Sequence, residues 1–424
     1  MPTDAAVNAQ AMLARRPAPA YTLGLLTGLY VAQGLPYGFF TQALPVLMRE
    51  AGHSLKAISL TSLLFLPWML KFLWGPLVDR VGRPRAWLIP LQLGTALGAA
   101  ALTLVDLSQG FVLLFTAFLV FNLFASMQDV VTDGLAVRLL DTRQRGLANG
   151  IQVGAYRIGM VLGGGLLLYV YARLGWQPMF LSMALLLLLC SLPTFWLRVE
   201  HRAPPARIAA SELARGGWLR LRQPGVLGFI GLIGAYKFGD TLGASLVGPF
   251  MKDLGLSKEM IALLKGTLGS SFGLAGAALG GWLVFRMGRR SALLGFGVAQ
   301  TASLALYVLA ALQIGGIGML WAACIGEHLF GGMATVALFT LMMDASEPEH
   351  AGTDYSLYAC AIVCVQGLAA FAGGALADAS GYAPTFAAAT MASGLGCLLL
   401  VARLDRRPGP ASLAQVWSPR RTTA

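Results

Sequence analysis

The chain has 424 residues, of which 57% are hydrophobic and only 12% are charged, and its formal net charge is +12. Soluble domains carry roughly 25% charged residues, so the composition excludes a soluble globular protein and indicates an integral membrane protein. The positive charge is typical of arginine-rich cytoplasmic loops and does not indicate nucleic-acid binding. The five cysteines lie in apolar stretches without other metal-ligating residues, so we expect no metal site and no cofactor.

Twelve apolar stretches are long enough to cross a hydrocarbon layer of about 30 Å as helices. They predict an all-α polytopic membrane protein, because only helices and closed barrels satisfy every backbone group in lipid. The stretches cover residues 20–48, 56–78, 86–108, 110–138, 146–172, 176–197, 226–250, 260–284, 291–313, 315–343, 353–378 and 383–402.

A long arginine-rich segment divides these helices six and six. Most other lysines and arginines fall in alternate loops, which predicts that both termini lie in the cytoplasm of a bacterial inner membrane. The expected organisation is an N-terminal tail over 1–19, a six-helix bundle over 20–197, a cytoplasmic linker over 198–225, a second bundle over 226–402 and a tail over 403–424.

The first predicted helix combines prolines with polar side chains. Pro36 and Pro45 remove backbone hydrogen bonds and are expected to kink it. Gln33, Tyr37 and Gln42 lie beside these kinks. Such side chains suit a helix that lines a substrate pathway, with simple packing as the alternative.

The loop after the second helix reads GPLVDRVGR over residues 75–83. Its glycines permit a tight turn, and its aspartate is able to pair with an arginine or with a helix N-terminus. This loop resembles the signature loop between helices 2 and 3 of the major facilitator superfamily. The resemblance implies two six-helix halves and a cytoplasmic gate that includes Gly75, Asp79, Arg80, Gly82 and Arg83.

The two halves also resemble each other. When the second half is aligned so that Gly281 falls on Gly75, Gly352 falls on Gly146, and both pairs lie in corresponding cytoplasmic loops. Two pseudo-repeat halves with a site between them are the plan of one large class of secondary transporters.

The fourth and fifth helices carry charge at membrane depth. Asp129 and Asp133 are four residues apart and share one helix face, with Gln128 beside them. Arg157 follows on the next helix. Charges within a membrane are costly unless they face a cavity or a partner, so we expect these four residues to line the substrate pathway. Two acids on one face also suit proton coupling, because they do not ionise together without a cation or a proton.

A more specific resemblance covers the first five helices. It is to AmpG-type permeases, a branch that includes muropeptide permeases, the acetyl-CoA transporter and bacterial siderophore permeases. It implies that Gln128 and Asp129 are functionally sensitive. After Asp133 the chain reads GLAVR where muropeptide permeases tend to carry an aromatic residue and a lysine, which leaves a siderophore or another small solute open. The matching motifs are GLPYG (34–38), PWMLKFLWGPLVDR (67–80), SMQDVVTDG (126–134), RGLANG (145–150) and YRIGM (156–160).

The second half offers two candidate charge sites. Lys237 and Asp240 are three residues apart and either line the pathway or pair with each other. Glu327 and His328 are candidates for a proton site, with a structural hydrogen-bonded pair as the alternative. Lys71, in the second helix, is expected to reach the interface or to support the gate.

The loop between helices 10 and 11 contains acids and no lysine or arginine. We expect Glu347 and Glu349 to meet the arginines of the signature loop and to help close the cytoplasmic side.

These features predict a monomeric secondary transporter that imports an amphipathic organic solute, such as a siderophore or an anhydro-muropeptide, by proton symport and alternating access. Efflux of small molecules is the alternative direction. A polytopic membrane enzyme such as an acyltransferase is the alternative class, although no phosphate-binding or nucleophile motif supports an enzyme.

Overall fold

The computed structural model describes residues 19–44, 47–48, 63–64, 66–80, 83–105, 111–140, 144–197, 218–223 and 225–404. Predictions that concern the terminal tails, most of the linker, Gly82, and the side chains of Gln42 and Arg80 therefore lie outside the described residues. The described part of the chain is helical and contains no strand, which confirms the all-α prediction.

The N-terminal half contains six helical segments at the predicted positions. The second is broken into short pieces where Pro67, Gly75 and Pro76 interrupt the regular hydrogen bonding. The segments are α2 (Pro19–Gly38) with η1 (Phe39–Ala43); α5 (Leu66–Met69), η3 (Lys71–Leu73) and α6 (Gly75–Arg80); α7 (Pro84–Ala101) with η4 (Leu102–Leu104); α8 (Phe111–Leu139); α9 (Arg145–Val161), η6 (Leu162–Leu166) and α10 (Leu167–Leu174); and α11 (Trp176–Ser191) with η7 (Leu192–Trp196).

The C-terminal half contains the other six segments. Across both halves, nine of the described helices are long and apolar enough to cross a membrane. The C-terminal segments are α13 (Val226–Ala244) with α14 (Val247–Asp253); α15 (Lys258–Ile261), η8 (Ala262–Leu268) and α16 (Gly269–Met287); α17 (Arg289–Ala311); α18 (Gly316–Asp344); η9 (Pro348–His350) and α19 (Ala351–Ser380); and α20 (Tyr382–Arg403).

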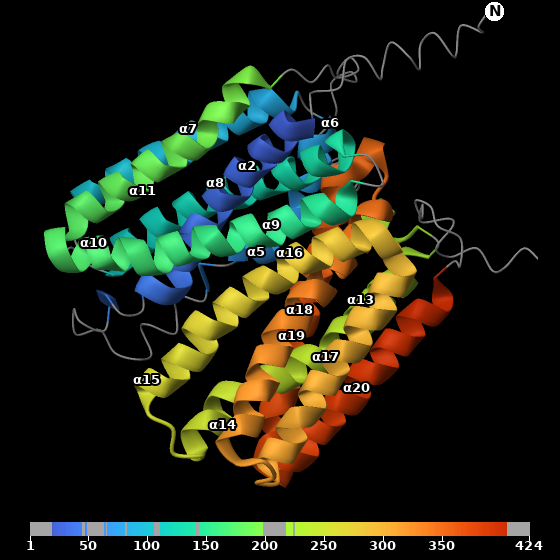
Figure 1. Ribbon diagram of the computed structural model, residues 1–424. Coiled ribbons are helices and arrows are strands. Elements are labelled where there is room, and N and C mark those ends of the chain that lie inside the picture. Colours follow the sequence, from blue (N-terminus) through green and yellow to red (C-terminus); the bar gives the residue numbers. More distant parts are fainter. Residues whose placement is uncertain are drawn as a thin grey trace, which may run out of the picture.

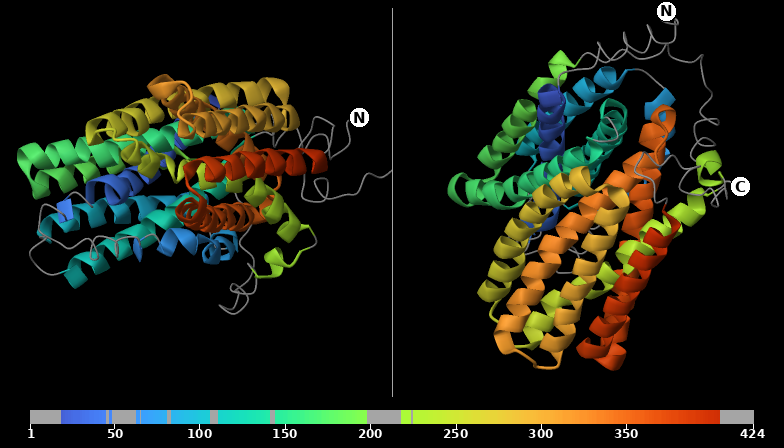
Figure 2. Two further views of the ribbon diagram at one scale, coloured as in Figure 1. Left: turned by 90° about the horizontal axis from the view of Figure 1, so that it is seen from below. Right: turned by 45° about the vertical axis from the view of Figure 1, so that its right-hand side comes forward.

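Helices of each half pack on one another, and one large apolar cluster is shared by the two halves. In the N-terminal half α2 packs on α9, and α7 packs on α8 and α11; in the C-terminal half α13 packs on α20, and α17 packs on α18 and α20. Figures 1 and 2 show the two bundles side by side, with α9 of the first half against α16 of the second. The second contact between the halves joins α8 and the α5–α6 segment to α19.

The contacts between the halves follow the repeat that the sequence predicted. Gly75 of the first half packs on the backbone of Thr353 at the start of α19. Its counterpart Gly281 packs on Gly150 near the start of α9. A Cβ at Gly281 would lie 2.9 Å from the Cα of Gly150, so only glycine permits this approach without a shift of the backbone. In each half, the equivalent glycine therefore packs against the fifth helix of the other half.

These close contacts lie at the end of the molecule that carries the signature loop. In Figure 1 the opposite ends of the halves, marked by α10 and α14, diverge. The two bundles are therefore joined at one end, with the charged side chains of α8, α9 and α18 between them.

Candidate functional site: charged clusters between the halves

Asp129 and Asp133 of α8 share a single buried lysine. The Nζ atom of Lys71 lies 2.5 Å from Oδ2 of Asp129 and 3.3 Å from Oδ2 of Asp133. All three side chains are at least nine-tenths buried. With every group ionised the cluster carries one uncompensated negative charge, which is costly away from water unless a proton or another cation joins it.

Three further side chains surround this acid cluster, which we define as Lys71, Asp129 and Asp133. Tyr30 of α2 donates to Oδ1 of Asp133 at 3.2 Å. Gln152 of α9 is placed to donate to the same oxygen at 3.4 Å and to the hydroxyl of Tyr355 at 3.3 Å. Since Tyr355 belongs to α19, the acid cluster of the first half is in contact with the second half.

The predicted polar residues of the first helix and Gln128 lie in the same half. Gln33 is buried, and neither polar atom of its amide has a hydrogen-bond partner among the described residues. Tyr37 packs its ring on Tyr156, with centroids 5.5 Å apart. Gln128 is also buried. For Gln42 only the backbone is described, and it belongs to η1, the wider helical turn that follows Pro36.

Arg157 reaches from α9 to the second half. Its guanidinium occupies the space that a Cβ at Gly273 of α16 would need. One turn earlier on α16, Gly269 makes room in the same way for the ring of His328. His328 Nδ1 lies 3.0 Å from Glu327 Oε2, and the Tyr307 hydroxyl donates to the same oxygen at 3.4 Å. Arg157 and the Glu327–His328 pair therefore occupy neighbouring positions along one helix face.

Lys237 and Asp240 pair with each other. Their charged atoms are 2.6 Å apart, and Lys237 is also placed to donate to Oγ1 of Thr335 at 3.2 Å. Of the two alternatives that the spacing left open, the structure has the ion pair. This pair is buried like the acid cluster, but its two charges cancel, whereas the acid cluster has one negative charge in excess.

Asp79 of the signature loop joins the two halves. Its carboxylate accepts hydrogen bonds from the backbone N–H groups of Gly352 and Thr353, at 3.0 and 2.7 Å, and from Arg138 at 2.6 Å. The N–H groups at the start of α19 have no partner within the helix, and the helix dipole also favours a negative charge there. The aspartate thus has both partners that the sequence suggested, an arginine and a helix N-terminus.

The structure gives Glu347 a partner outside the signature loop, while its predicted contact with Arg80 stays a prediction because that side chain is not described. Glu347 pairs with Arg220 of the linker at 3.0 Å, and Arg220 also binds Asp354 at 2.8 Å. Glu349 is exposed, as is Arg83 of the signature loop. Burial lowers the pKa of Arg220, but its hydrogen bond to Asp354 and the nearby Glu347 outweigh burial and raise it.

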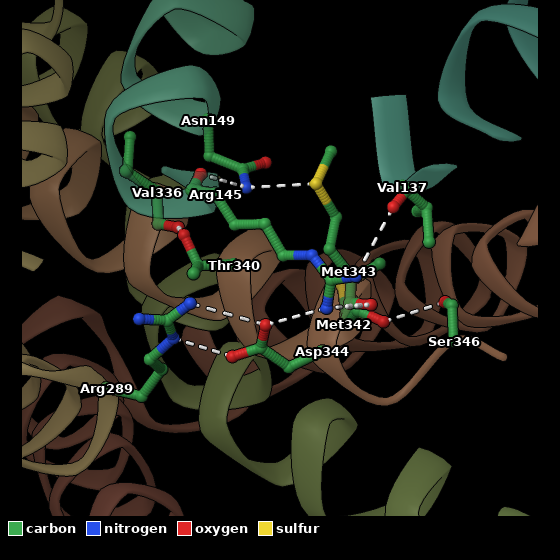
Figure 3. A network of polar contacts seen from close by, with 10 residues as sticks. All are labelled: Val137, Arg145, Asn149, Arg289, Val336, Thr340, Met342, Met343, Asp344 and Ser346. Carbon is green, nitrogen blue, oxygen red and sulfur yellow. Dashed lines mark hydrogen bonds and ion pairs between the residues drawn. The ribbon is translucent and has the colours of Figure 1, made fainter. Parts of the chain in front are cut away.

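A second ionic contact between the halves involves residues that the sequence analysis did not single out. Figure 3 shows Asp344, at the end of α18, between Arg145 of α9 and Arg289 of α17. The distances are 2.9 Å to Arg145 and 2.6 Å to Arg289. The carboxylate of Asp344 is almost fully buried, so its charge is compensated by arginines from both halves.

The residues of these clusters that sequence reasoning missed share no single signal. Lys71 was recognised as a cation at membrane depth but was not assigned to the aspartates of α8. Arg145, Asn149 and Gln152 recur at intervals of four and three, and this spacing marks a polar helix face. Tyr30 and Tyr355 carry no such signal, because single tyrosines in membrane helices are common.

Comparison with known proteins decides the family. The family model of the Major Facilitator Superfamily matches residues 26–365. The chain belongs to this superfamily. Within it, the anhydromuropeptide permease of Escherichia coli is 31% identical over 350 residues, which cover 78% of this chain and 70% of that protein. An uncharacterized protein of Haemophilus influenzae is 30% identical over 348 residues, covering 77% and 81%. The resemblance to AmpG-like permeases is therefore confirmed.

Solved structures of the superfamily share the fold. The transporter FucP in its outward conformation superposes with a TM-score of 0.72, at 15% identity, over 90% of this chain and 97% of FucP. A bacterial homologue of ferroportin in an outward-facing state gives 0.67, at 17% identity, over 89% and 98%. The named relatives and structural neighbours are transporters, so this Major Facilitator Superfamily member is a multi-pass secondary transporter and not a membrane enzyme.

Proposed function

We propose that this transporter imports an amphipathic organic solute across the bacterial inner membrane together with a proton. The observation that carries the proposal is the acid cluster, in which two buried carboxylates share one lysine. One bound proton makes the cluster neutral, so protonation from outside and release inside give an energy source for uptake.

The conformation has one closed end, and its side of the membrane follows from the charges of the loops. The arginine distribution favours a cytoplasmic location for the joined end of the halves, which contains Asp79 and Asp344. In that orientation the pathway is closed to the cytoplasm by contacts of α9 with α16 and of α19 with α8. Alternating access then requires the halves to part at Asp344 and to close at the opposite end.

We propose an anhydro-muropeptide as the first solute to test, because the Escherichia coli relative is named for that cargo. Such a solute joins sugar rings to a peptide and suits a pathway with paired tyrosine rings, Tyr37 and Tyr156, beside charged groups. Glu327 and His328 form a second candidate proton site, adjacent to Arg157.

Uptake by purified protein in liposomes tests the proposal. We expect accumulation of a labelled anhydro-muropeptide when the outside is more acidic than the inside, and only equilibration without the gradient. A ferric siderophore serves as the parallel substrate. Equal uptake with and without the pH gradient would exclude proton coupling. Accumulation that occurs only when the inside is more acidic than the outside would indicate efflux.

A further inference from the structure

Three polar side chains follow one another along a single face of α9. Arg145, Asn149 and Gln152 are spaced by four and three residues and so stack on the same side of the helix. All three are buried, and Asn149 is fully inaccessible. We call them the α9 polar row.

The row connects two sites already described. At one end Gln152 contacts Asp133 of the acid cluster at 3.4 Å. At the other end Arg145 binds Asp344 at the cytoplasmic contact between the halves, at 2.9 Å. Asn149 lies between them, one turn from Arg145, and donates to the carbonyl oxygen of that residue at 2.8 Å.

Every member of the row has one polar atom without a hydrogen-bond partner in the part of the chain that the structure describes. These atoms are Oε1 of Gln152, Oδ1 of Asn149 and Nε of Arg145. In Figure 3 the amide nitrogen of Asn149 points to the carbonyl of Arg145 and to the sulfur of Met343, while its oxygen has no dashed contact. A buried polar atom left unsatisfied costs about 1–3 kcal/mol, and bound water is the usual remedy.

We propose that the α9 polar row holds a file of water through which the proton of Asp133 leaves for the cytoplasm. This inference rests on the proposed proton coupling. The O–H bond of protonated Asp133 breaks, and the proton passes to water beside Gln152 and then past Asn149. The carboxylate that remains lies 3.3 Å from Lys71, which it shares with Asp129, so the cluster then carries one negative charge until it takes up the next proton. The other described titratable groups near Asp133 are Asp129, Tyr30, Tyr156 and Tyr355.

The cytoplasmic end of the row is closed by charge in this conformation. Arg145 and Arg289 both bind Asp344, and their positive charges oppose the passage of a hydrated proton. Arg145 belongs to the first half and Asp344 to the second, so the movement that opens the cytoplasmic side also separates them. The proton is thereby released only after the halves have moved, which prevents a leak.

The test replaces Asn149, which touches neither the acid cluster nor the aromatic pair of the pathway. We expect Asn149→Leu to lower gradient-driven uptake and proton entry, read by a trapped pH dye, by about tenfold, because one polar position of the row is lost. Solute exchange at equal pH needs no net proton release and should stay near the wild-type rate. Asn149→Ser keeps a hydroxyl and leaves room for water, so it should retain most proton entry.

Gln92→Leu is the matched control. Gln92 is buried on α7, and its amide atoms also lack partners among the described residues, but α7 packs on α8 and α11 and lies away from the row. It should leave proton entry unchanged. Normal proton entry in Asn149→Leu, or an equal loss of exchange and proton entry, would overturn the inference. Uptake by the wild type without proton entry would instead overturn the proposed proton coupling itself. This result differs from both outcomes described for Asn149→Leu.

Discussion

Among the described residues, each half of the protein buries one lysine at membrane depth, and the two lysines differ in the acids they meet. Lys237 has one partner, Asp240, three residues away on the same helix. Lys71 faces two aspartates of a different helix, Asp129 and Asp133. The residue types and their burial are the same, but only the acid cluster of the first half has an uncompensated negative charge. The comparison teaches that a proton has a place in the N-terminal cluster that the C-terminal pair does not offer.

The largest effect is expected from removing the lysines. Lys71→Met leaves two buried carboxylates without a cation, and breaking a buried pair costs about 3–5 kcal/mol, so uptake should be abolished. Lys237→Met leaves a single carboxylate that one proton neutralises, and uptake should fall by a smaller factor. Uptake per amount of membrane-inserted protein is the measurement.

A second-site change sharpens the same comparison. Adding Asp129→Asn to Lys71→Met removes one of the two carboxylates that lack a cation. The double variant should regain the normal membrane abundance that the single variant loses, without regaining proton-driven uptake. If Lys71→Met and Lys237→Met reduce uptake equally, the distinction between an unbalanced cluster and a balanced pair is wrong.

An intermediate effect is expected where Arg157 crosses to the second half. Gly273→Ala places a methyl group where the guanidinium lies, and the flexible arginine must move relative to Glu327. We expect uptake to fall several-fold at normal membrane abundance, because the substitution displaces the charge of Arg157 and leaves the packing of the helices intact. Gly367→Ala is the matched control, since a Cβ there meets nothing within 4 Å. Equal uptake by Gly273→Ala and Gly367→Ala would show that the position of Arg157 does not affect transport.

The smallest effect is expected where the ion pairs approach the surface. Arg220 binds the buried Asp354 and also Glu347, whose side chain is 49% exposed. Exposed pairs contribute about 0–1 kcal/mol, so Glu347→Gln should barely change thermal stability in detergent. Asp354→Asn weakens a buried charged contact worth about 1.5–3 kcal/mol and should lower the melting temperature measurably. A larger shift for Glu347→Gln would contradict this ranking.

The fold was largely predictable from the sequence. Apolar length determines where helices cross a membrane, and the predicted segments coincide with the helical pieces from α2 to α20. The alignment of Gly75 with Gly281 marked equivalent positions of the two halves, but their contact with the other half was not predicted. The break in the second helix was not predicted, although Pro67 and Pro76 lie on either side of Lys71 and give a reason for it.

The partners of the charges were only partly predictable. The spacing of Asp129 and Asp133 determines that they share a face, and that of Lys237 and Asp240 permits their pairing. The contacts of Lys71 with α8 and of Arg145 with Asp344 depend on how distant helices pack, which no local pattern encodes. Glu347 illustrates the limit, since its local charge suggested the signature-loop arginines while the packing placed Arg220 beside it.

The most direct test of the account is the proton movement that accompanies a downhill solute gradient in liposomes without an imposed pH difference. Wild type and Asp240→Asn should carry protons inward with the solute, whereas Asp133→Asn should let the solute equilibrate with no proton movement. Proton entry that persists in Asp133→Asn at the wild-type ratio to solute would contradict the assignment of the transported proton to the acid cluster.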